Sequence, residues 1–508
     1  MRAFFVYIRY MIRKLVQNSI LLCLLFVVSQ WRVSAQSYYV DYNQEISNCY
    51  QKIIELKFNE AEIDISQLSE LEPNNLAILH LENYIDFFTL FIDESESEFK
   101  QRRKDLKKRL KKLDKLSDDN PYKLFIKAEI KLQWAVVASK FGEQMSVMKD
   151  IYSAYRLLKE NQIEFPDFIL NNKSLSVIHA VNETLPLPKL IKSLFALEGS
   201  IDRGEKEIQK FIEQAKEAQS MFYYEAIASY SAISLYQRND KHKAFEIIRD
   251  SDLDPAISPL VAFLFAKIAQ RAGYNDEAMQ YLNQSPVGDQ YKDFDYIFFL
   301  KGLSSIRKLE SNADQYFLRF VNEFEGRLYI KEAYQKLGWY ELIMNNDLVA
   351  YKKYMTLLEN NGTSIVDDDK QAQEEAKSGK IPNPEMLKAR LLFDGGYYQR
   401  SFNLLVTNGH LFEEPGLKLE HTYRLGRATQ LLENYIDAID YFKTTIRLGI
   451  DSKEYYACNA ALQLGIIYEH LGQSEEAEKS LKNCLSMRPS KYKNSLHHKA
   501  KAGLDRLK

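Results

Sequence analysis

The sequence predicts an all-α protein made of consecutive helical hairpins that stack into a solenoid. Apolar residues recur at helical spacing in several stretches, and pairs of small residues recur 12 positions apart. Small side chains at that spacing let two antiparallel helices, joined by a short turn, approach each other closely. A single hairpin cannot bury its own apolar face, so neighbouring hairpins must pack together.

Seven pairs of small residues have this spacing. They are Cys49 with Ala61, Ala232 with Ala244, Ala266 with Ala278, Gly338 with Ala350, Ala389 with Ser401, Gly426 with Ala438, and Gly465 with Ala477. The first pair is followed by Pro73 and the last by Pro489, where a proline would end the second helix. An irregular helical domain with accidental spacings is the alternative.

The stretch from Tyr455 to Pro489 resembles a tetratricopeptide repeat. It carries Leu464-Gly465, Tyr468, Ala477 and the final proline at the spacings of such a repeat. The resemblance implies a right-handed α-solenoid of tetratricopeptide-like hairpins, whose concave groove binds a protein or peptide. Residues 132–215, with their prolines and glycine turn, resemble the central region of the fungal inclusion body clearance proteins and the related animal tetratricopeptide-repeat outer-membrane family.

Residues 1–35 are predicted to be a secretory signal peptide. Basic residues precede an apolar run from Ile20 to Val28, and Val33-Ser34-Ala35 ends in small residues. We expect cleavage after Ala35, with an uncleaved anchor as the alternative. Exported tandem-repeat chains with few cysteines resemble periplasmic proteins of Gram-negative bacteria, which implies a location in the periplasm or at the outer membrane.

Net charge and cysteine content disfavour two classes of protein, those that bind nucleic acid and those stabilised by disulfides. Without the leader, 63 basic residues remain against 70 acidic ones, a net charge of −7 that disfavours nucleic-acid binding. Three cysteines remain, and a small, odd number of cysteines disfavours a fold that depends on disulfides. Cys49 is expected to be buried. For Cys458 and Cys484, at the two ends of one hairpin, a bridge and simple burial both stay open.

The segment from Lys100 to Lys115 is the most basic part of the chain, with ten Lys or Arg against two Asp. Phe99, Leu106, Leu110, Leu113 and Leu116 recur within it at helical spacing, which predicts an amphipathic helix with a solvated charged face. The alternative is a peripheral contact with anionic lipid or an acidic partner.

The remaining chain is divided by composition. We expect hairpins with the basic helix at 36–120, a helical region with a proline- and glycine-punctuated turn at 121–220, and further repeats at 221–359. A polar loop is predicted at 360–384, because this segment is acidic and contains Gly362, Gly379, Pro382 and Pro384. Three repeats and a capping helix follow at 385–508.

The sequence contains no recognised catalytic or cofactor motif. HExxH, CxxC, GxSxG, GxxxxGK[ST] and GxGxxG are all missing, and the eight histidines are scattered. Asp367-Asp368-Asp369 could hold a hard cation, but consecutive acids in a loop are usually only solvated. We therefore expect no enzyme activity, no cofactor and no metal.

These observations favour an exported scaffold that binds a protein or peptide partner. Trp339 and Tyr340 are the best candidates for exposed aromatic contacts, together with Tyr423 and Arg424. A membrane-associated assembly or transport accessory that uses Lys100–Lys115 is the alternative function. A carbohydrate binder ranks last, because the chain has only three tryptophans. The identity of the partner, the pathway and the oligomeric state cannot be read from the sequence.

Overall fold

The computed structural model describes residues 37–184 and 197–507. Within them, regular structure is helical apart from one isolated bridge between Tyr39 and Asn75, so the predicted all-α array is confirmed. The predicted leader, Pro186 and Pro188 lie outside the described residues.

The helices of the first half are α2 (Gln44–Ile54), α3 (Phe58–Leu71), α4 (Ala77–Asp93), α5 (Glu96–Leu113), α6 (Tyr122–Lys140), α7 (Gln144–Glu164), α8 (Leu170–Thr184), α10 (Ile201–Glu217), α11 (Tyr223–Ala232), η1 (Ile233–Arg238), α12 (Lys241–Arg249), α13 (Pro259–Ala272) and α14 (Asn275–Gln284). Those of the second half are α15 (Tyr296–Lys308), α16 (Ala313–Glu323), α17 (Ile330–Tyr340), η2 (Glu341–Asn345), α18 (Leu348–Asn360), α19 (Asp367–Ser378), α20 (Pro384–Asp394), α21 (Tyr398–Thr407), η3 (Gly409–Leu411), α22 (Pro415–Leu431), α23 (Tyr435–Gly449), α24 (Tyr456–His470), α25 (Ser474–Ser486) and α26 (Lys493–Arg506).

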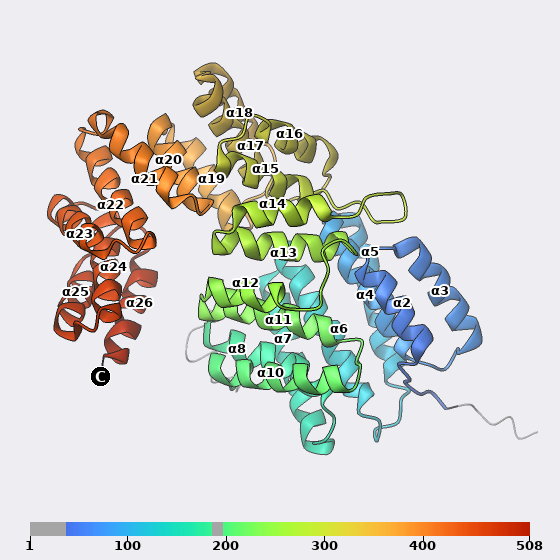
Figure 1. The fold of residues 1–508 in the computed structure, drawn as a ribbon. Coiled ribbons are helices and arrows are strands. Elements are labelled where there is room, and N and C mark those ends of the chain that lie inside the picture. Colours follow the sequence, from blue (N-terminus) through green and yellow to red (C-terminus); the bar gives the residue numbers. More distant parts are fainter. Residues whose placement is uncertain (1–36, 185–196, 508) are drawn as a thin grey trace, which may run out of the picture.

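The array folds back on itself, as Figure 1 shows. It rises from α10 through α14, turns at α15 to α18, and returns through α20 to α26, so that the last helices form a second limb. One apolar core runs without a break from Ile46 to Leu391, whereas the returning limb has three smaller cores of its own. The N-terminal hairpins and the first limb therefore share one core, and the returning limb is less tightly integrated.

Small residues bring the two helices of a hairpin together, as the spacing predicts. A Cβ added to Gly465 would lie 2.5 Å from Leu481, and one added to Gly426 would lie 2.7 Å from Phe442. Two other predicted contacts use hydrogen bonds, since the Cys49 thiol and the Ser401 hydroxyl donate to the backbone carbonyls of their partners 12 residues away. All the predicted packing residues except two are fully buried: Cys49, Ala61, Ala244, Ala266, Ala278, Gly338, Ala389, Ser401, Gly426, Ala438, Gly465 and Ala477.

The two exceptions, Ala232 and Ala350, are half-buried and shifted by one residue from the contact. Ser231 takes the place of Ala232 and donates to the carbonyl of Ala244, 13 positions away. A Cβ added to Gly338 would meet Met355 at 2.6 Å and Tyr351 at 3.3 Å, and not Ala350. In both hairpins the first helix ends in a π-helix, η1 or η2, and the wider π-turn accounts for the additional residue.

The hairpin of α15 and α16 departs from the predicted spacing in the other direction. Gly302 packs against Phe317, as Gly426 packs against Phe442, but the buried alanine of this hairpin, Ala313, lies only 11 positions after Gly302. A search for pairs 12 apart therefore passes over it.

The prediction of a polar loop at 360–384 is wrong, because Asp367–Ser378 forms helix α19. In this helix the side chain of Asp369 is fully buried. It accepts hydrogen bonds from the backbone N–H groups of Tyr329 (2.7 Å) and Glu332 (3.0 Å) at the start of α17. Acidic residues that suggest a solvated loop thus cap a neighbouring helix, where an acceptor for free N–H groups is favourable.

Candidate partner-binding surface

Charged side chains from both limbs interact electrostatically. The cations come from α12, α13, α15 and α22, and the acids from α17, α19 and the end of α20. We call this set the inner cluster: Lys241, Lys267, Arg271, Arg307, Arg427, Glu332, Asp368 and Asp394. Each member acts electrostatically on others of the set, as Arg307 does with Asp394, Glu332 and Arg271.

Two glycines hold the limbs together beside the inner cluster. Gly396, in the turn before α21, lies so near the turn after α13 that an added Cβ would be 1.9 Å from the carbonyl oxygen of Gly273. Next to this contact, the Tyr397 hydroxyl donates to Asp276 (2.7 Å) and accepts from the Asn275 side chain (3.1 Å). The returning limb therefore contacts the first limb directly at this turn.

The inner cluster has more positive charge than it can neutralise. Arg271 pairs with Asp368 at 3.9 Å, and Glu332 pairs with Lys336 at 3.3 Å. Among the described residues no acidic group lies within 4.0 Å of the cationic groups of Lys241, Lys267, Arg307 and Arg427, the other four cations of the cluster. Asp394 acts electrostatically on two of them, Arg307 and Lys241.

Two of these cations are poorly solvated. Nη1 of Arg307 is buried and has no hydrogen-bond partner among the described residues, although a guanidinium carries five donors. Burial lowers the pKa of Lys267 to about 8, and burial also lowers the pKa of Arg307. A buried cation without a counter-ion costs free energy, which an anion bound beside it would recover.

A cavity of about 280 Å³ adjoins the cluster through Lys267. Its walls are mainly apolar and aromatic and include Tyr236, Phe263, Leu300 and Tyr329. The Lys267 ammonium lies 5.0 Å from the centre of the Tyr329 ring. The cavity's other lysine, Lys140, is already paired with Glu94 at 2.6 Å. This combination can hold an apolar side chain next to a negatively charged group.

Trp339 and Tyr340 are not exposed, which corrects the sequence-based expectation. Trp339 is 6% and Tyr340 7% exposed. The indole N–H donates to Glu375 of α19 (2.7 Å), and the Tyr340 hydroxyl donates to the carbonyl of Ser311 (2.7 Å). Trp339 is buried because the segment expected to be a loop is a helix that covers α17.

Tyr423 and Arg424 lie on α22, the helix that carries Arg427, but they too have partners within the chain. The Tyr423 hydroxyl accepts from Asn459 (2.7 Å), and Arg424 donates to Glu420 one turn earlier (2.7 Å). Arg427, which sequence reasoning did not single out, lies one turn further along the same helix and has no acidic partner within 4.0 Å among the described residues.

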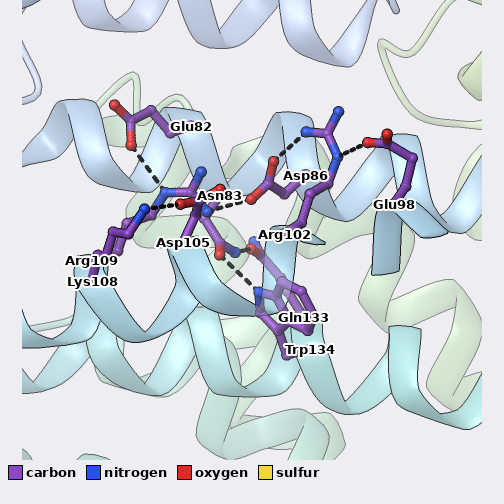
Figure 2. Close-up of polar contacts among 10 residues, drawn as sticks. All are labelled: Glu82, Asn83, Asp86, Glu98, Arg102, Asp105, Lys108, Arg109, Gln133 and Trp134. Carbon is purple, nitrogen blue, oxygen red and sulfur yellow. Dashed lines mark hydrogen bonds and ion pairs between the residues drawn. The ribbon is translucent and has the colours of Figure 1, made fainter. Parts of the chain in front are cut away.

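The basic segment Lys100–Lys115 forms most of helix α5, and its arginines face inward. Figure 2 shows Arg102 and Arg109 converging on Asp86 of α4, with Arg102 also 2.8 Å from Glu98 and Arg109 2.9 Å from Glu82. Beneath them, the indole of Trp134 donates to Asn83 at 3.0 Å. These arginines attach α5 to the N-terminal hairpins.

The lysines of α5 face solvent. Lys104, Lys107 and Lys111 are exposed, lie one turn apart along the helix, and have no acidic partner among the described residues. The predicted amphipathic helix is confirmed, since Phe99, Leu113 and Leu116 are buried and Leu106 and Leu110 pack against the same core. No helix in the described part of the chain is long and apolar enough to cross a membrane.

No family model and no curated protein matches the chain. Among solved structures, it is similar to the TPR domain of P58(IPK), at 13% identity over 84% of this chain and 98% of that one, with a TM-score of 0.20. It is also similar to the APC/C hetero-tetramer Cut9–Hcn1 (13% identity, 92% and 96% covered, TM-score 0.24) and to Naa15/Naa10 bound to HypK (11% identity, 91% and 66% covered, TM-score 0.23). At these scores the description of the fold rests on the chain's own helices and contacts.

Proposed function

We propose that this chain is a non-enzymatic scaffold that binds a protein or peptide partner through the inner cluster. The observation that carries the proposal is the group of cations without acidic partners, contributed by both limbs next to an aromatic cavity. Such a surface offers charge and apolar contact at one place, as partner-binding surfaces do. In this proposal α22, which carries Tyr423, Arg424 and Arg427, contributes the returning limb's part of the binding surface.

The experiment is a crosslinking pull-down of the chain from Gln36 onward, in cells of its source. The test variant is Arg427→Glu, and the matched control is Lys443→Glu on the exposed face of α23. We expect one stoichiometric protein to be recovered by the wild type and by the control, and to be lost with Arg427→Glu. Equal recovery by all three chains would refute the inner cluster as the binding surface.

We also propose that the chain is exported to the periplasm or the outer membrane, on the strength of the apolar run before Ala35. Mass spectrometry of the protein purified from its source checks this. A mature N-terminus at Gln36 in the envelope fraction supports export, and a protein that keeps Met1 in the cytoplasmic fraction contradicts it.

A peripheral contact with anionic lipid through α5 is the second candidate. The segregation of arginines inward and lysines outward favours it, because the exposed lysines contribute nothing to the ion pairs that hold the helix. The test is sedimentation with anionic liposomes. Lys104, Lys107 and Lys111 changed together to Glu should abolish salt-sensitive binding, whereas the same change at Lys352, Lys353 and Lys443 should preserve it. Equal binding by both variants would exclude this function.

A further inference from the structure

We propose that the inner cluster recognises an acidic segment of its partner, in which a carboxylate pairs with Lys267 and Arg307 while a neighbouring apolar side chain enters the cavity lined by Tyr236 and Tyr329. This inference rests on the proposed scaffold function and adds the chemistry of the ligand. It assigns a binding site to residues that neither motif nor spacing had singled out.

The first step of the argument is the position of the two cations. Lys267 on α13 and Arg307 on α15 act on each other electrostatically and share Arg271, Glu332 and Asp368 as charged neighbours. Arg271 is already paired with Asp368, and Glu332 with Lys336. The helices that carry the two cations, α13 and α15, contact each other, and neither cation has a salt-bridge partner in the described chain. A carboxylate from outside would complete this arrangement.

The second step concerns Nη1 of Arg307. This atom is inaccessible to solvent and has no hydrogen-bond partner among the described residues. Buried polar groups in folded proteins are almost always satisfied, and an exception needs a reason. A ligand carboxylate that displaces the neighbouring side chains slightly would supply two acceptors in the plane of the guanidinium.

The third step distinguishes a peptide from a nucleic acid. Glu332, Asp368 and Asp394 are interspersed among the cations, so a continuous polyphosphate would be repelled at several points. A carboxylate on a peptide places one negative charge locally and avoids these acids. The cavity beside Lys267 is apolar and about 280 Å³, large enough for a Leu or Phe side chain, which a peptide can supply next to Asp or Glu.

The experiment measures the binding of a fluorescent peptide of alternating Asp and Leu by anisotropy. The comparison probes are the same peptide with Asn for Asp, the same peptide with Ser for Leu, and a single-stranded oligonucleotide. We expect the Asp–Leu peptide to bind in a salt-dependent manner, and each of the first two changes to weaken binding about tenfold or more. Tighter binding of the oligonucleotide than of the peptide would overturn the inference.

The variants are Lys267→Met and Arg307→Gln, with Lys443→Gln as the control. Each of the two variants Lys267→Met and Arg307→Gln should bind the Asp–Leu peptide about tenfold more weakly than the wild type does. Each should bind the peptide with Asn in place of Asp as weakly as the wild type does. Both should also melt at the same temperature as the wild type or higher, because each removes a buried charge that has no salt-bridge partner. Unchanged affinity in two well-folded variants would refute the site.

Failure here can be told apart from failure of the scaffold function. If no acidic peptide binds but Arg427→Glu still loses the crosslinked partner, the scaffold proposal stands and the ligand chemistry is wrong. If the peptide does not bind and all chains recover the same proteins, both proposals fail.

Discussion

The single residue Asp369 connects helix α19 to the start of α17, and nothing in the sequence indicates this contact. It accepts from two N–H groups at the start of α17, where Tyr329 has a left-handed conformation (φ 64°). The pKa of Asp369 is raised to about 7, chiefly by burial; the two N–H donors oppose this rise, and the nearby carboxylates of Glu332 and Asp368 add to it.

Replacing this cap should destabilise the protein in a pH-dependent way. Asp369→Ala removes two accepted hydrogen bonds, so we expect a loss of about 1–2 kcal/mol. The folded pKa of about 7 exceeds the ordinary value of 3.8, so the wild type loses stability as the pH rises between these values. The deficit of Asp369→Ala should therefore be greatest near pH 4 and narrow toward pH 7. Thermal melting across this range checks it, and a deficit that widens with pH would contradict the sign.

At the element scale, Cys458 of α24 and Cys484 of α25 face each other with their sulfur atoms 3.5 Å apart, both buried and both reduced in this structure. A disulfide needs about 2.05 Å, a small closure for two packed helices. We expect a mild oxidant to join Cys458 and Cys484 and to leave Cys49 as a thiol. Cys49 is buried, and its thiol donates a hydrogen bond to the backbone carbonyl of Ala61.

Alkylation followed by mass spectrometry without reductant measures this bridge. In the chain from Gln36 onward, which keeps three of the four cysteines, one alkylated cysteine per oxidised chain is the expected count. Cys484→Ser in the same chain should show two alkylated cysteines under the same treatment. Three alkylated cysteines in the oxidised wild type would show that the helices do not close. Finding the bridge in protein isolated from its source would also support export, because oxidising compartments permit disulfides.

The hairpins themselves were largely predictable, because the small residues at the contacts between paired helices recur 12 positions apart in the sequence. The errors came from single-residue changes in the connection, as at η1 and η2, where a π-turn moves Ala232 and Ala350 out of the contact. Composition misled at α19, where acidic residues suggested solvent although Asp369 is buried. The inner cluster was not predictable, because Lys241 and Arg427 are brought together only by the return of the second limb.

At the scale of the whole molecule, Glu94 joins the N-terminal hairpins to the rest of the array. Its buried carboxylate pairs with Lys140 (2.6 Å) and accepts from the backbone N–H groups of Arg327 and Leu328, both at 2.8 Å, and from the hydroxyl of Tyr296. These partners come from three separate parts of the chain, so one side chain connects them.

Glu94→Ala should loosen this junction. It would leave Lys140 buried without a counter-ion, for which we expect a loss of about 3–5 kcal/mol. Hydrogen exchange should accelerate in α4 and α6 and at the start of α17, and should be unchanged in α24 and α25. Because Glu94→Ala also removes packing, the control is Glu94→Gln with Lys140→Met, which removes both charges and should recover most of the loss. If exchange rises equally in α24 and α25, the effect is global unfolding and not a junction.

The contact of Gly396 with Gly273 joins the two limbs that carry the cations of the inner cluster. Gly396→Ala would place a Cβ 1.9 Å from a backbone oxygen, so the limbs must separate. The matched control is Gly379→Ala, which has the same left-handed backbone strain (φ 62° against 84°) but no atom within 4 Å of the new Cβ.

We expect Gly396→Ala to increase the radius of gyration in small-angle scattering and to weaken the acidic peptide about tenfold, while Gly379→Ala changes neither. The helical content should be the same in both, since each substitution lies in a turn outside the helices and the returning limb has cores of its own. An expanded chain that still binds the peptide would show that Lys267 and Arg307, which both lie outside the returning limb, suffice without that limb. A chain that neither expands nor loses affinity would show that the limbs are held together by contacts other than the two glycines.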